Sequence, residues 1–226
     1  MNHTNLFSKM LLLNKPLSLR CVTLRFDYDC SQLITTTVIT TNLTYLNLLF
    51  YTKTFDEILF YVLIPILRIQ KSLRQMNAII KHPIILEYDT TFNIPNPLSM
   101  NKNDLPRVVS LKKFFLEILT QFDINSLGII LYCMPNLQQI SFTFIAEYLD
   151  TSFINILFNG NIWQQILINY VPYLKKFDIY ISVLTDKGLF DLKSILDSFR
   201  CFVTQYNGWN MSVTRLRAFE KPKKCK

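Results

Sequence analysis

A six-residue pattern that begins with leucine recurs along the chain and constrains its fold more than any other feature. The pattern is LxxΦxΦ, where Φ is an apolar residue, and repeats of this kind decide the architecture of a chain. Four full copies lie at residues 19–24, 43–48, 137–142 and 174–179. Two weaker copies lie at residues 73–78 and 105–110. The second of these ends at the polar Ser110, where Val109 and Leu111 offer the opposite phase.

The spacing of the copies indicates a repeat architecture. Their leading leucines, at positions 19, 43, 73, 105, 137 and 174, are 24 to 37 residues apart, within the range of about 20 to 50 residues typical of solenoids. In each copy the apolar residues alternate, as a half-buried strand requires. Between the copies, helical patterns are predicted at 56–69 (interrupted by Pro65), 112–122, 161–170 and 186–205. Residues 33–41 fit a strand or a short helix.

The sequence therefore predicts an α/β fold. We expect an irregular leucine-rich-repeat-like solenoid, with a parallel sheet on one face and helices on the other. The alternative is an α/β domain without repeats, in which a leucine-rich chain shows the pattern by chance. We expect residues 17–219 to form the solenoid, residues 1–16 to be an N-terminal segment without a clear fold signal, and residues 220–226 to be a basic tail.

Composition supports a folded chain. Half of the 226 residues are hydrophobic and 18% are charged, which excludes intrinsic disorder because enough apolar surface is available to offset chain entropy. The five cysteines are odd in number and form no CxxC pair, so reduced, mostly buried thiols are expected. The longest apolar run, residues 58–67, is too short to span a bilayer, and no secretory core is visible. The sequence thus predicts a cytoplasmic or nuclear protein without membrane contact.

Two copies carry a proline two residues before the leading leucine. They are Met134-Pro-Asn-Leu137-Gln-Gln-Ile140-Ser-Phe142 and Val171-Pro-Tyr-Leu174-Lys-Lys-Phe177-Asp-Ile179. The proline blocks the continuation of a preceding helix, and a strand follows. With residues 157–170, 191–206 and Trp209, these copies resemble the irregular leucine-rich repeats of invertebrate F-box proteins, over most of residues 17–219.

The resemblance implies a non-enzymatic protein–protein interaction module, similar to the substrate-recognition part of an F-box type ubiquitin-ligase receptor. In that family a helical F-box precedes the repeats and binds the ligase adaptor, which would be a further partner here if such a segment exists upstream. Only 18 residues precede the first copy, so the F-box itself is not evident.

A second departure from the family concerns the asparagine ladder. In regular repeats, an asparagine or cysteine eight residues after the leading leucine bonds to buried backbone groups. The corresponding residues here are Asp27, Tyr51, Lys81, Lys113, Ile145 and Ser182. None of them fits, so we expect an irregular, flatter solenoid.

No motif points to catalysis. The sequence contains no glycine-rich phosphate loop, no HExxH motif and no paired cysteine–histidine zinc pattern. A cysteine–histidine nucleophile would need His3 or His82, and the apolar residues around Cys133 predict a thiol in the core. We therefore predict a protein that is not an enzyme, with no cofactor and no metal site. An α/β enzyme of unknown class is an alternative.

The net charge of +8 leaves a second alternative, a binder of nucleic acid or of another anionic surface. No recognition motif for RNA or DNA accompanies the charge, so a protein target is the partner that we expect.

The predicted function depends on the side chains that point away from the core. Cβ direction alternates along a strand, so the third, fifth and seventh residues of each copy share one face, and on a solenoid they form a continuous strip. The strip comprises Cys21, Thr23, Arg25, Tyr45, Asn47, Leu49, Gln75, Asn77, Ile79, Arg107, Val109, Leu111, Gln139, Ser141, Thr143, Lys176, Asp178 and Tyr180. Tyrosine and arginine are favoured anchors in protein interfaces. The residues that we expect to bind a partner are Arg25, Tyr45, Asn47, Gln75, Asn77, Arg107, Gln139, Ser141, Lys176, Asp178 and Tyr180.

Overall fold

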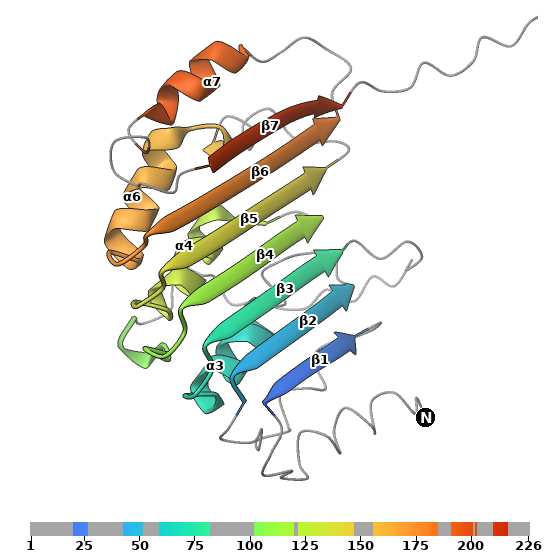
Figure 1. Ribbon diagram of the computed structural model, residues 1–226, viewed down its shortest axis with the longest axis vertical. Coiled ribbons are helices and arrows are strands. Elements are labelled where there is room, and N and C mark those ends of the chain that lie inside the picture. Colours follow the sequence, from blue (N-terminus) through green and yellow to red (C-terminus); the bar gives the residue numbers. More distant parts are fainter. Residues whose placement is uncertain are drawn as a thin grey trace, which may run out of the picture.

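Seven parallel strands form one open sheet, in which the order along the sheet follows the order along the chain (Figure 1). The computed structural model describes residues 20–26, 43–51, 59–81, 102–119, 122–146, 156–184, 191–200, 202 and 210–216. The strands are β1 (Cys21–Phe26), β2 (Tyr45–Tyr51), β3 (Gln75–Lys81), β4 (Lys113–Leu119), β5 (Gln139–Ala146), β6 (Lys176–Leu184) and β7 (Asn210–Leu216). Strands β1 and β7 are the two edges, so the sheet does not close into a barrel.

Helices connect the strands and lie along one side of the sheet (Figure 1). They are α3 (Ile64–Ile69), α4 (Ile124–Tyr132), α6 (Gly160–Tyr170) and α7 (Leu192–Ser198), with a π-helical turn η2 (Leu59–Leu63) before α3 and a 3-10 turn η4 (Lys102–Asp104). Helix α4 contacts η2 and α6, and α6 contacts α7. The predicted α/β class with a parallel sheet is confirmed.

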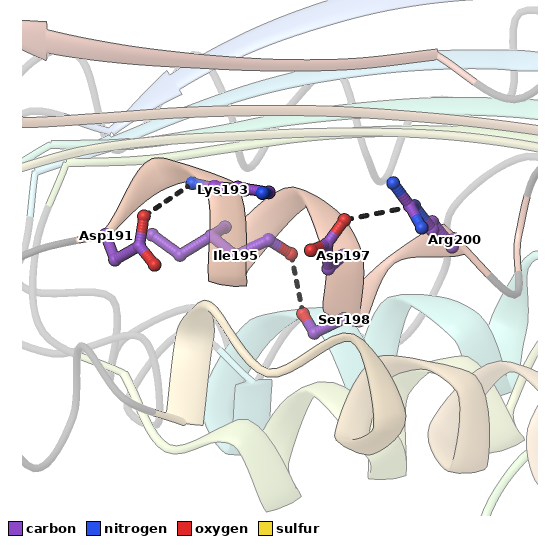
Figure 2. A network of polar contacts seen from close by, with 6 residues as sticks. All are labelled: Asp191, Lys193, Ile195, Asp197, Ser198 and Arg200. Atoms are coloured by element: carbon purple, nitrogen blue, oxygen red, sulfur yellow. Dashed lines mark hydrogen bonds and ion pairs between the residues drawn. The ribbon is translucent and has the colours of Figure 1, made fainter.

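Side-chain caps begin the helices that follow strands β4, β5 and β6. The carboxylates of Asp123 and Asp191 and the amide oxygen of Asn159 each accept a hydrogen bond from the backbone N–H two residues later, at 3.0 Å. Such caps satisfy backbone donors that have no partner within the helix. The Ser194 hydroxyl and the Lys193 N–H hold the pKa of Asp191 below its ordinary value. Figure 2 shows this cap and the ion pair between Asp197, in the last turn of α7, and Arg200, which follows the helix.

The core lies between the sheet and the helices. In β2 and β3, burial alternates residue by residue, and the buried positions are in register across the sheet. One buried row runs from Leu46 through Met76, Phe114 and Ile140 to Phe177. The leucine two residues before each of strands β2 to β6 is also buried. The leucine-led pattern therefore marks where each strand enters the core.

A backbone hydrogen-bond pattern repeats at the start of each strand from β1 to β6. The carbonyl oxygen just before one strand accepts from two successive N–H groups at the start of the next, at 2.8 to 3.1 Å. The accepting carbonyls belong to Arg20, Thr44, Arg74, Lys112 and Gln138. We call each strand, together with the turn that leads into it, a unit. Each unit is thus joined to the next by the same geometry, although the length of chain between the strands differs.

Polar side chains in the turns add a second set of links. Ser72 and Ser110 donate to the carbonyls of Leu43 (3.0 Å) and Leu73 (2.7 Å), each in the preceding unit. The amide of Asn136 donates in the same way to the carbonyl of Val109 at 3.1 Å. All three donors lie three residues before their strands. They satisfy backbone acceptors at this edge of the sheet, a role that asparagine ladders have in regular repeats.

The fourth predicted copy is wrong, and so is the helix predicted at 112–122. Residues 105–110 lie outside any strand, and residues 113–119 form β4 between β3 and β5. The copy that enters the sheet begins at Leu111 and reads Leu111-Lys-Lys-Phe114-Phe-Leu116. The segment is apolar enough to fit either the helical period of about 3.6 residues or the strand period of 2. In the structure its buried residues alternate one by one, as in a strand.

Other helices match their predictions to different degrees. The helix predicted at 161–170 is confirmed as α6, and the one at 56–69 is described as η2 and α3, with Pro65 in the first turn of α3. In the pattern at 186–205, the structure describes residues 191–200 and 202, of which Leu192–Ser198 form α7, and Leu196, an apolar residue of that pattern, is 52% exposed. Helix α4 and strand β7 were not predicted. Residues 1–16, 33–41 and 220–226 lie outside the described residues.

Candidate interaction surface on the open face of the sheet

The side chains of β1 to β6 that point away from the helices form the open face of the sheet. Parallel pairing in register places them in three full rows. The first row is Cys21, Tyr45, Gln75, Lys113, Gln139 and Lys176. The second is Thr23, Asn47, Asn77, Phe115, Ser141 and Asp178. The third is Arg25, Leu49, Ile79, Glu117, Thr143 and Tyr180. With strands about 4.8 Å apart, each row is a line about 24 Å long.

These rows remain partly accessible. Every side chain in them is half-buried or exposed, and in the described part of the chain no helix lies over this face (Figure 1). The rows mix aromatic, aliphatic and hydrogen-bonding groups with five charged side chains, Arg25, Lys113, Glu117, Lys176 and Asp178. Tyr45, Phe115 and Tyr180 lie on alternate strands, β2, β4 and β6, so large rings are spread across the face.

Contacts between neighbouring side chains order part of the open face. The amide nitrogen of Asn77 donates a hydrogen bond to the hydroxyl of Tyr45 at 2.7 Å. The ammonium of Lys176 lies 2.9 Å from a carboxylate oxygen of Asp178. At the other end of the strands, the guanidinium of Arg25 lies over the ring of Tyr51, 5.5 Å from its centroid. These pairs hold the rings and charges of the face in defined positions.

Some hydrogen-bonding capacity of the face is unused. Three polar atoms are shielded from solvent and have no hydrogen-bond partner among the described residues. They are the Oδ1 atoms of Asn77 and Asp178, both in the second row, and the hydroxyl of Ser182. A buried polar atom without a partner costs about 1–3 kcal/mol. The open face therefore contains polar atoms whose hydrogen-bonding capacity the described residues do not use.

Ten of the eleven predicted contact residues lie in the three rows, and Arg107 does not. It precedes β4 in a segment outside the sheet, and its guanidinium lies 4.7 Å from the ring centroid of Tyr132, at the end of α4. The strip prediction is likewise wrong for Val109, which lies in an exposed turn, and for Leu111, which is fully buried. All three errors follow from the shifted fourth copy.

The sequence prediction missed the side chains that β4 contributes to the open face. Lys113, Phe115 and Glu117 occupy the first, second and third rows. The signal was present, because the copy that begins at Leu111 satisfies LxxΦxΦ better than the copy that begins at Leu105. Beyond the three rows, Tyr51 and Lys81 continue the face at the ends of β2 and β3.

The described thiols differ in environment. Cys133 is fully buried, as predicted, and burial raises the pKa of its thiol to about 12, against the opposing influence of Arg68, Arg107 and Lys71. A thiol in this state is protonated and a poor nucleophile. Cys21 is exposed, and neither cysteine forms a disulfide. Nothing about Cys133 equips it for covalent chemistry.

Within the described residues, no three histidine, cysteine or acidic side chains gather as a metal site would require. No described helix combines the length and the apolar character needed to cross a bilayer. Comparison with protein-family models, with curated proteins and with solved structures found no match to this chain.

Proposed function

We propose that this chain is an irregular leucine-rich-repeat-like solenoid that holds a protein partner on the open face of its sheet. In this respect it would be similar to the substrate-recognition part of an F-box type ubiquitin-ligase receptor. It would perform no chemistry, and a ligase adaptor would bind it only through an F-box upstream of the repeats. The observation that carries the proposal is the set of three in-register rows of half-buried mixed side chains.

The repeat character is supported by two independent sets of links. Strand order follows chain order without a crossover, and the same bifurcated backbone contact joins each unit to the next from β1 to β6. Side-chain donors at Ser72, Ser110 and Asn136 occupy equivalent positions in three successive units. A chain of stacked units, each in contact only with its neighbours, would produce this arrangement.

Protein binding is supported by the chemistry of the open face. Interfaces favour tyrosine and phenylalanine anchors surrounded by hydrogen-bonding groups, and Tyr45, Phe115 and Tyr180 lie among asparagine, glutamine, serine and threonine side chains. Two of the five charges on the face, those of Lys176 and Asp178, pair with one another, which reduces the number of ions that a polypeptide would have to desolvate. We also propose a reducing compartment, the cytoplasm or the nucleus, which the free thiols of Cys21 and Cys133 support.

Matched surface variants test the proposal. Phe115→Asp and Tyr180→Asp each place a charge on the open face, whereas Leu196→Asp places the same charge on an exposed position of α7. The purified variants would serve as baits for a cell lysate, with captured proteins quantified by mass spectrometry and folding checked by circular dichroism. We expect one set of proteins to be captured by the wild type and by Leu196→Asp and to be lost from both face variants. Equal capture by all four folded chains would refute the open face as the binding surface.

A further inference from the structure

Positive charge gathers at the N-terminal ends of the strands, along the border of the sheet that runs from β1 across to β6. We call this set the basic edge. Nine described side chains belong to it: Arg20, Arg68, Lys71, Arg74, Arg107, Lys112, Lys113, Lys175 and Lys176. The chain as a whole carries a net charge of +8, so the edge holds a large share of its excess cations.

Parallel topology explains why these residues lie together. All strands begin at the same edge, and six of the nine cations occupy the first position of a strand or the position just before it. Arg68 lies in the last turn of α3, and Lys71 lies in the turn that leads into β3. Arg107 is held against Tyr132, which ends α4 just before the turn into β5.

Three of these cations lie close enough to the buried thiol of Cys133 to influence it. Arg68, Arg107 and Lys71 all act to lower the pKa of the Cys133 thiol, against the larger effect of burial. Because electrostatic influence falls with distance, all three charges lie near Cys133. Hydrogen bonds place two of the segments: the N–H of Val108, next to Arg107, donates to the Cys133 carbonyl at 2.8 Å, and the Arg68 guanidinium donates to the Asp104 carbonyl at 3.1 Å.

Acidic residues are distributed differently. On the basic edge, the described carboxylates are those of Asp104, in η4 beside Arg68, and Asp178, which pairs with Lys176. At the opposite edge, where the strands end, Arg25 and Lys81 are offset by acidic residues. These are Glu117, Asp123 and Asp191. The basic edge is therefore a local excess of positive charge and not a reflection of overall composition.

The basic edge is continuous with the open face. Lys113 and Lys176 belong to both, since they start β4 and β6 and lie in the first row of the face. A partner that covers the first row must also meet the edge. A ligand that covers both surfaces therefore needs negative charge where it meets the basic edge and a neutral, partly apolar surface where it meets the open face.

We propose that the protein partner carries an acidic segment that lies across the strands along the basic edge, while its neighbouring residues cover the open face. This inference rests on the proposed function and names the chemistry of the partner. The rows measure about 24 Å from β1 to β6, and an extended chain covers about 3.3 Å per residue, so the acidic segment would be about seven residues long.

The open face favours a polypeptide over a nucleic acid. Glu117 and Asp178 lie in the third and second rows, where they would repel a phosphate backbone laid from the edge onto the face. A polypeptide can place aspartate and glutamate on the edge and donors or apolar side chains on the rows. Charge complementarity of this kind raises association rates and makes binding depend on salt.

Fluorescence anisotropy with three labelled probes tests the inference: a ten-residue polyglutamate peptide, a ten-residue polyglutamine peptide and a twelve-nucleotide oligouridine. The edge variant is Arg74→Gln with Lys175→Gln. The control is Lys193→Gln with Arg200→Gln, which removes the same charge from α7 and the residues that follow it. We expect polyglutamate to bind at low ionic strength, polyglutamine to fail, and the edge variant alone to weaken polyglutamate by about tenfold, as the loss of two exposed ion pairs would do. Equal polyglutamate binding by both variants, or tighter binding of oligouridine than of polyglutamate, would overturn the inference.

The outcomes separate this inference from the proposed function. If Phe115→Asp abolishes capture of cellular proteins while the edge variant captures them normally, the acidic segment is refuted and the open face stands. If the edge variant abolishes capture and Phe115→Asp does not, the edge binds an acidic partner without the face, and the proposed function is refuted.

Discussion

Gly160 at the start of α6 lies directly against the backbone of Ser198 at the end of α7. A Cβ atom added to Gly160 would lie 2.1 Å from the Ser198 carbonyl oxygen and 2.5 Å from its carbonyl carbon. The Gly160 N–H donates to the Ser198 hydroxyl at 3.0 Å, and that hydroxyl donates to the Ile195 carbonyl within α7 (Figure 2). The absence of a side chain at residue 160 therefore allows two helices to meet.

Replacement of Gly160 by alanine should destabilise the chain. The added carbon clashes with backbone rather than with a movable side chain, and overpacking of this kind costs about 1–3 kcal/mol. Urea unfolding followed by circular dichroism measures the change. Gly128→Ala is the matched control, because its added carbon meets only the ring of Tyr170, at 3.0 Å, and alanine favours a helix interior by about 1 kcal/mol. Equal stability of the two variants would contradict the close approach.

Removal of a turn donor should loosen the junction between two units. In Ser110→Ala, the carbonyl of Leu73 loses its 2.7 Å hydrogen bond, at an expected cost of about 1 kcal/mol. Ser141→Ala, which removes a hydroxyl from the open face, should change the free energy of unfolding by less than about 0.5 kcal/mol. Thermal and urea unfolding of both variants provide the measurement. A larger loss from Ser141→Ala would argue against a stabilising role for the side-chain donors in the turns, Ser72, Ser110 and Asn136.

Cys133 should resist alkylation in the folded chain. Its pKa of about 12 keeps the thiol protonated near neutral pH, and no part of it reaches solvent. Iodoacetamide at pH 8, followed by peptide mass spectrometry, should modify Cys21 first and Cys133 only when urea unfolds the chain. Modification of both residues at the same rate under native conditions would show that Cys133 is accessible.

Alkaline pH should lower stability through Cys133. Below pH 9 the thiol is protonated in both states. Between pH 9 and 12 the unfolded chain releases this proton while the folded chain keeps it, because the folded pKa is raised from 9.0 to about 12. The free energy of unfolding should therefore fall by about 1 kcal/mol per pH unit from this group alone. Between pH 9.5 and 10.5, unfolding free energies of the wild type should fall more steeply than those of Cys133→Ala. Parallel slopes would exclude the effect.

Trp163 should be a major contributor to stability. Its indole N–H donates to the Leu157 carbonyl at 2.8 Å, and its ring centroid lies 5.0 Å from that of Phe142 and 5.7 Å from that of Phe177. Trp163→Phe keeps an aromatic ring but leaves the carbonyl without this donor, for a loss of about 2 kcal/mol. Urea unfolding measures it, and Trp163→Ala should cost more, about 3–5 kcal/mol. A smaller loss in Trp163→Ala than in Trp163→Phe would contradict the packing.

Most of the open face could be predicted from local sequence. The alternation of apolar and polar residues in copies such as 43–48 and 137–142 predicts which side chains enter the core. The structure pairs these copies in one register. Ten of the eleven predicted contact residues consequently share a face. The fourth unit could not be placed in this way, because residues 105–119 contain apolar residues in two competing phases. Pairing with β3 and β5 chose the phase that begins at Leu111.

By itself, the sequence determined the α/β class, the strand positions marked by leucine and helix α6, which ends before Pro172, since these follow from local periodicity and local backbone restriction. Only the tertiary structure decided the phase of β4, the edge strand β7, the approach of Gly160 to Ser198 and the proximity of Arg68, Lys71 and Arg107 to Cys133. Each of these joins residues far apart in the chain or chooses between equivalent local patterns. The physical reason is that the hydrogen bonds and the buried contacts between neighbouring strands form between distant segments. Their free energy therefore depends on several segments at once and cannot be read from the sequence of one.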